Sequence, residues 1–69
     1  MKSATGVIPE EMFDPSRIGD VMDFLIPLPI PGREKVDILT AWAHAVGTQI
    51  SSSRYAQMYN SGVDGPGGP

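Results

Sequence analysis

Apolar residues first recur at helical spacing shortly after a strong helix-start signal. Asp14 can accept hydrogen bonds from free backbone N–H groups, and Pro15 suits the first position of a helix because its nitrogen has no hydrogen to leave unpaired. A stripe at positions i, i+3, i+4 and i+7 follows: Ile18, Val21, Met22 and Leu25. Pro27 ends the pattern, since the residue before proline avoids helical geometry. The sequence predicts a helix over residues 15–25.

A second stripe begins near residue 31 or 32 with alternating spacings of three and four: Val36, Leu39, Ala43, Val46 and Ile50. Two endings are compatible with it. A break at Gly47 would leave a serine to cap a third short helix at about residues 52–60. Alternatively, one helix continues to Asn60, with Gly62 as its left-handed C-terminal residue. The register kept across Gly47 favours the continuous helix.

Between the two stripes lies a proline strap at residues 26–32. Its three prolines alternate with apolar residues, so neither a helix nor a central strand can form there. An extended, polyproline-like segment is expected. Because a solvent-exposed linker would rarely be so apolar, we expect this strap to lie against the chain's own helices or against a neighbour.

These elements predict an all-α fold, a small αα-hairpin. The N-terminal arm spans residues 1–13, the helical hairpin residues 14–61, and a flexible Gly/Pro tail residues 62–69. The predicted core consists of Phe13, Ile18, Val21, Met22, Leu25, Leu28, Val36, Leu39, Trp42, Ala43, Val46 and Ile50.

The length of 69 residues limits the size of this core. Chains this short usually gain stability from disulfides, a structural metal or association. The sequence has no cysteine and a single histidine, His44, which excludes disulfides and a metal site of several imidazoles. Association is the remaining route, so the sequence predicts a partner surface. The lack of cysteine is also compatible with the cytoplasm, although it fixes no location.

Charge is unevenly distributed along the chain. The net charge is −3, and residues 1–23 carry five carboxylates against two basic side chains. Between Ile38 and Val63 the only charged side chain is Arg54. A helix facing bulk water usually carries lysine and glutamate. This uncharged stretch therefore indicates packing on more than one side, and the acidic balance argues against nucleic-acid binding.

A helix-turn-helix DNA-binding regulator is the alternative interpretation. Its first helix would be residues 34–45, its turn Gly47, and its recognition helix residues 51–60. Against it, Ser53 would occupy the position that normally packs into the core, and the chain supplies few phosphate contacts.

Enzymatic chemistry is not indicated. Asp37 and Ser51 each lie two helical turns from His44, about 10 Å by helical rise, too far for a local triad. No cofactor, metal loop or small-molecule site is recognisable. No stretch approaches the length of a membrane span, and the N-terminus lacks the apolar region of a signal peptide.

We therefore interpret the chain as a non-enzymatic structural or interaction subunit that packs into a larger protein assembly, for example a virion, or self-associates. The arm and the strap would lie on the partner as extended segments. The predicted partner interface consists of Leu28, Ile30, Ile38, Trp42, Ala45, Tyr55, Met58 and Tyr59.

Overall fold

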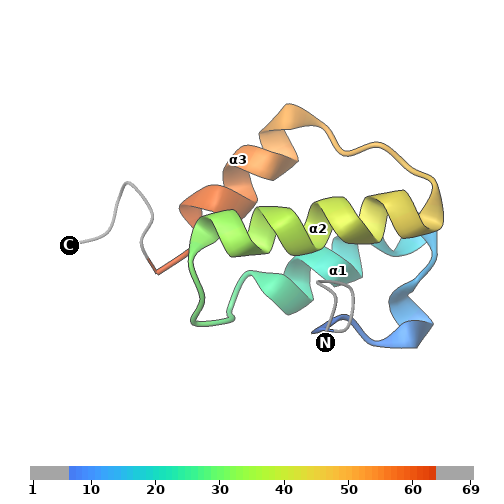
Figure 1. Ribbon diagram of the computed structural model, residues 1–69, viewed down its shortest axis with the longest axis horizontal. Helices are drawn as coiled ribbons and strands as arrows, with labels where there is room; N and C mark the ends of the chain where they lie inside the picture. The colour runs from blue at the N-terminus through green and yellow to red at the C-terminus, as the bar shows by residue number, and fades with distance from the viewer. Residues whose placement is uncertain (1–6, 64–69) are drawn as a thin grey trace.

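The computed structural model describes residues 7–63, which form three α-helices and no strand. Helix α1 is Ile18–Leu25, α2 is Gly32–Val46 and α3 is Ser52–Asn60. Short 3₁₀ turns at Glu10–Met12 and Pro15–Arg17 precede α1. Figure 1 shows α2 across the centre of the molecule, with α1 on one side and α3 on the other. The predicted all-α fold is confirmed.

The predicted start of the first helix is also confirmed. Asp14 caps the 3₁₀ turn that leads into α1, and its Oδ1 accepts hydrogen bonds from the Ser16 backbone N–H at 2.9 Å and from the Ser16 hydroxyl at 2.8 Å. These two bonds lower the pKa of the Asp14 carboxyl, because they stabilise its charged form.

The prediction of one continuous helix to residue 60 is wrong. Gly47 ends α2 with a φ of 73°, in the left-handed region that favours glycine. The N–H groups of Gly47 and Thr48 both bond to the Ala43 carbonyl, which closes the last turn. Ser51 then caps α3 by accepting a bond from the Arg54 N–H. Ile50 lies in the connection between α2 and α3 and still packs against the core. The apolar spacing from Val46 to Ile50 therefore did not require a helix there.

The strap at residues 26–31 is not extended, contrary to prediction. The Leu28 N–H bonds to the Leu25 carbonyl at 3.1 Å, and the Ile30 N–H bonds to the Leu28 carbonyl at 2.9 Å. Proline fixes φ but leaves ψ free, so the segment turns twice while each non-proline residue still donates a hydrogen bond. Leu28 and Ile30 are half-buried against the chain's own core.

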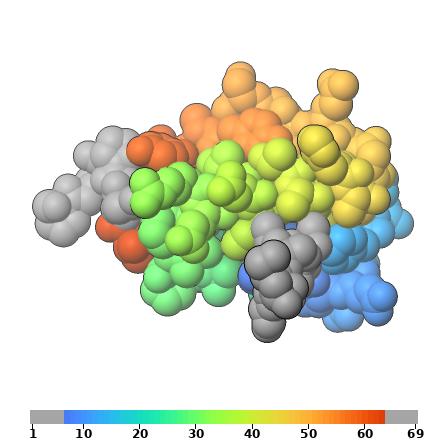
Figure 2. Space-filling model, in the orientation of Figure 1, coloured from blue at the N-terminus to red at the C-terminus, as the bar shows by residue number. Residues whose placement is uncertain are grey.

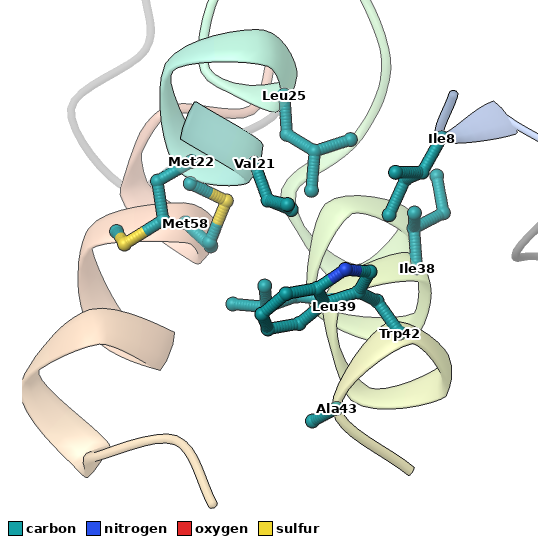
Figure 3. Close-up of a cluster of buried hydrophobic side chains, with 9 residues drawn as sticks. All are labelled: Ile8, Val21, Met22, Leu25, Ile38, Leu39, Trp42, Ala43 and Met58. Carbon is teal, nitrogen blue, oxygen red and sulfur yellow. The ribbon is translucent and has the colours of Figure 1, made fainter. Parts of the chain in front are cut away.

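A single core lies between the three helices, with Trp42 at its centre (Figure 3). The indole is fully buried, at 0% exposure. Six predicted core residues are buried: Val21, Met22, Leu25, Leu39, Trp42 and Ala43. The other six are half-buried at its edge: Phe13, Ile18, Leu28, Val36, Val46 and Ile50. The core also contains three residues that the prediction omitted, namely Ile8, Ile38 and Met58.

The described part of the arm, residues 7–13, packs on this core. Ile8 is buried, and the Trp42 Nε1–H donates to the Met12 carbonyl at 2.7 Å. The 3₁₀ turn makes this stretch compact, so the predicted extended arm is wrong for residues 7–13. Residues 1–6 of the predicted arm lie outside the described residues.

The chain is as compact as a folded domain of its length is expected to be. Its accessible surface is 4372 Å² for a mass of 7.4 kDa, and a folded monomer of that mass is expected to expose about 4,200 Å². Its radius of gyration is 11.4 Å, against about 11 Å expected for this length.

Candidate interaction surface at the closed end of the hairpin

Helices α2 and α3 form an antiparallel pair whose backbones meet at one end, which we call the closed end. A β-carbon on Gly32, the first residue of α2, would overlap with the Tyr59 carbonyl group near the end of α3. A β-carbon on Gly62 would overlap with the backbone nitrogen and α-carbon of Gly32. Only glycine fits at either position, because both neighbours are backbone atoms that no side-chain rotation can move.

Lys35 holds the same end together from the inside. Its side chain is 0% exposed, and its ammonium donates to the Ile26 carbonyl, to the Ser61 carbonyl at 2.9 Å and to the Ser61 hydroxyl at 3.3 Å. Ile26 and Ser61 are the C-terminal caps of α1 and α3, where helix dipoles present partial negative charge. One cation thus joins the ends of two helices to the first turns of a third.

No carboxylate of residues 7–63 pairs with Lys35. The single ion pair within residues 7–63 joins Arg17 to Asp20 on the exposed side of α1. Burial lowers the pKa of the Lys35 ammonium from its ordinary value, because removal from water penalises the charged form. All buried side-chain nitrogen and oxygen atoms in the described part of the chain nevertheless have a hydrogen-bond partner, so the site is polar but satisfied.

The loop before α2 and the end of α3 present apolar residues at the closed end. The Val63 N–H donates to the Ile30 carbonyl at 3.1 Å, which ties the residues after α3 to the loop before α2. Gly62 and Val63 therefore pack against the fold, and the predicted flexible tail is wrong for these two residues; residues 64–69 lie outside the described part. We call the outward-facing set the apolar end patch: Pro27, Leu28, Pro29, Ile30, Tyr59 and Val63.

Two members of this patch are large apolar residues with much of their surface exposed, Tyr59 at 46% and Val63 at 60%. Pro27 and Pro29 are exposed beside the half-buried Leu28 and Ile30. The loop and the end of α3 lie at the left of the molecule in Figures 1 and 2. No member of the patch carries a formal charge.

Charged side chains lie both at the closed end and elsewhere: Arg33 and Glu34 are exposed in the first turn of α2, and Asp37 is exposed one turn later. Glu10, Glu11, Asp14, Asp20 and Asp23 are all exposed and belong to the turns before α1 or to α1 itself. Arg17 balances only Asp20. Five of the seven carboxylates in residues 7–63 are therefore within residues 10–23, while the six residues of the apolar end patch carry no charge and Arg33 and Glu34 follow them in the first turn of α2.

The structure places the eight predicted interface residues in different surroundings. Three lie inside the chain's own core and present almost no surface: Ile38, Trp42 and Met58. Tyr55 is half-buried, and its hydroxyl lies 3.3 Å from the Thr40 hydroxyl. Ala45 is exposed on α2. The remaining three, Leu28, Ile30 and Tyr59, belong to the apolar end patch.

Sequence reasoning missed the buried lysine, although a signal for it was present. The stripe of α2 that enters the core is Lys35, Ile38, Leu39, Trp42 and Ala43, spaced at i, i+3, i+4, i+7 and i+8. A lysine on such a stripe must either reach water or find acceptors inside the fold. The close approach of Gly32 and Gly62 left no local signal, because it joins residues thirty positions apart.

The structure gives no support to the other chemistries considered. His44 is exposed at the end of α2 and makes no hydrogen bond or ion pair with any described residue. Among residues 7–63 there is no group of three or more potential metal ligands. None of the described helices is long and apolar enough to cross a membrane.

Two observations on α3, whose residues other than Tyr55 and Met58 are exposed, bear on the helix-turn-helix interpretation. In that motif the second helix projects a free face into the major groove and needs cationic neighbours. Here the end of α3 returns to the start of α2, and the single cation of α3, Arg54, directs its guanidinium to the Met22 sulfur at 3.4 Å.

Comparison of the chain with protein-family models, with curated proteins and with solved structures gives no match in any of the three.

Proposed function

We propose that this chain is a non-enzymatic interaction subunit that docks onto a protein through the apolar end patch. The observation that supports this most directly is the exposure of Tyr59 and Val63 beside the proline loop, on a support fixed by backbone contacts and by Lys35. A rigid support lowers the entropy lost on binding, because little chain has to become ordered.

The chemistry of the patch defines the partner's surface. Interface centres are depleted of charge and enriched in tyrosine, as is this patch. The partner would offer an uncharged apolar cleft for the Tyr59 ring, whose hydroxyl would find a hydrogen bond at the rim. The acidic residues 10–23 lie outside this contact and would keep nonspecific anionic partners such as nucleic acid away.

Site-specific photo-crosslinking in the cells that produce the chain tests this proposal. A photoreactive phenylalanine analogue replaces Tyr59 in one variant and Glu11, an exposed residue of the acidic region, in the matched control. We expect one discrete crosslinked protein from position 59 and none from position 11. Equal crosslinking from both positions, or none from position 59, would contradict the proposal.

A second variant tests whether the patch contributes to the affinity for the partner. Val63→Asp places a charge at the exposed edge of the patch without touching the core, and should weaken partner binding by about tenfold or more. Gln49→Asp on the exposed connection is the control and should leave binding unchanged. Salt-dependent binding of the wild-type chain to mixed-sequence DNA would instead support the helix-turn-helix regulator.

A further inference from the structure

Residues 47–51 connect α2 to α3. The segment after this connection is held to the rest of the fold by contacts that the connection itself does not make. Hydrogen bonds and close backbone contacts join residues 54–63 to residues 22–40: Arg54 to Met22, Tyr55 to Thr40, Ser61 to Lys35, Gly62 to Gly32 and Val63 to Ile30. The connection itself contributes only the caps at its two ends and the half-buried Ile50. Another copy of the chain could therefore supply residues 52–63 and make every one of these contacts.

The sequence of the connection also allows a second conformation. Residues 47–51 contain no proline, and the apolar spacing of α2 continues through them, from Val46 to Ile50. Residues 48–51 are not helical in the monomer; the left-handed φ of Gly47 ends α2, and Ser51, with an extended backbone, caps α3. If Gly47 takes a helical φ, residues 32–60 become one helix about 43 Å long, which carries α3 away from its own α2.

We propose that the chain forms a dimer by exchanging α3 between two copies, with residues 47–51 as the hinge. In this dimer α3 of each copy docks on α1 and α2 of the other, so the buried Met58 and the glycine contact of the closed end form between chains. The surface of α1 and α2 that α3 leaves is covered by α3 of the other copy. Because the sequence of that segment is identical, its shape and charge are complementary to the surface.

This proposal is independent of the proposed docking function. The exchange uses the inner face of α3, whereas docking uses the outward-facing Tyr59 and Val63. The apolar end patch is rebuilt from two chains in the dimer, because Ile30 of one copy then meets Val63 of the other. Loss of one activity would therefore leave the other measurable.

Refolding at high concentration tests the exchange. The wild-type chain, unfolded and refolded at about 1 mM, should contain a dimer by light scattering that persists for hours after dilution, because its dissociation requires α3 to undock. Mixing isotope-labelled and unlabelled chains before refolding allows contacts between chains to be detected by filtered NMR. We expect contacts between Gly62 of one chain and Gly32 of the other.

A pair of glycine variants sharpens the test. Gly47→Ala disfavours the left-handed conformation that Gly47 adopts in the monomer. Two monomers lose this strain when they form one exchanged dimer, so the dimerisation constant should rise by about tenfold or more. Gly19→Ala is the control, since a β-carbon there meets nothing within 4 Å, and it should leave the dimerisation constant unchanged. If Gly47→Ala does not fold, the wild-type refolding experiment decides alone. Only monomer in that experiment, or a dimer whose contacts join two apolar end patches, would overturn the proposal.

Discussion

The two ends of the α2–α3 pair are held by different kinds of interaction. At the closed end, local caps are joined by contacts between distant parts of the sequence: Gly32 and Gly62 bring backbones together, and Lys35 joins two helix C-termini. At the other end, Gly47 terminates α2 and Ser51 starts α3 through bonds to residues within five positions. Tertiary contacts thus hold one end and local capping forms the other.

This difference predicts that the closed end tolerates substitution least. Contacts that join distant segments are lost together when one of them fails, whereas a cap affects mainly its own helix end. The following substitutions test that order.

Gly62→Ala should have the largest effect. Its β-carbon would overlap with the Gly32 backbone, so α3 must move away from α2, at a cost of about 3 kcal/mol or more in the free energy of unfolding. Denaturant titration followed by circular dichroism measures the change. Gly19→Ala, in the exposed part of α1, is the matched control and should raise stability by about 0.5–1 kcal/mol. A similar value for both variants would show that the closed end is not tightly packed.

Lys35→Ala should follow, with a loss of about 2–3 kcal/mol. The substitution removes the buried stem of the side chain and leaves the carbonyls of Ile26 and Ser61 without their donor. Lys35→Met keeps most of the volume and should cost less, so the difference between the two variants separates packing from hydrogen bonding. Equal losses would mean that volume contributes nothing at this position.

The charge of Lys35 gives a separate dependence on pH. Its folded pKa is lowered, so just below its ordinary value of 10.5 the unfolded chain binds more protons than the folded chain. The free energy of unfolding contributed by Lys35 should therefore rise as pH increases through that window. Subtracting the pH profile of Lys35→Met isolates this slope, and a slope of opposite sign would contradict the burial of the ammonium.

Gly47→Ala should have a smaller effect on the monomer, about 1–2 kcal/mol, because alanine disfavours the left-handed conformation that ends α2. The measurement is a denaturant titration at low concentration, where monomer dominates. An unchanged midpoint would indicate that Gly47 adopts an ordinary helical φ in solution.

Ser51→Ala should have the smallest effect, about 0.5–1 kcal/mol. The cap bond from the Arg54 N–H is long, at 3.4 Å, and both residues are exposed, so water replaces it readily. The same titration measures it, with Ser52→Ala in the first turn of α3 as the control. A loss as large as that of Gly62→Ala would reverse the proposed order of the two ends.

Features that depend on local capping could be predicted from the sequence, whereas features that depend on contacts between distant residues could not. Capping is a local signal, so the start at Asp14 and the choice between two endings near Gly47 were both visible in the sequence. The choice itself was wrong because the apolar spacing of Val46 and Ile50 is satisfied equally by a helix and by a connection that lies against the core. Half of the predicted core was correct, because the apolar spacing of α1 and of the first part of α2 is also a local signal.

The candidate site was less predictable because it depends on contacts between distant residues. Leu28, Ile30 and Tyr59 were selected for their apolar character, but nothing local indicated that Gly32 and Gly62 would bring them to one end. Ile38, Trp42 and Met58 were assigned to a partner, Trp42 in addition to its place in the predicted core, because the expected two-helix core was too small. Docking of α3 and of Ile8 completes that core within the chain. Lys35 was the one readable signal that was overlooked.

The most direct test of the closed end is the nuclear Overhauser effect between the α-protons of Gly32 and Gly62 in a dilute, monomeric sample. The close backbone approach predicts a strong cross-peak between them, which disappears in Lys35→Ala if the lysine is needed to hold the two helix ends together. Absence of the cross-peak in the wild-type monomer would contradict the account, because α3 would then not return to the start of α2.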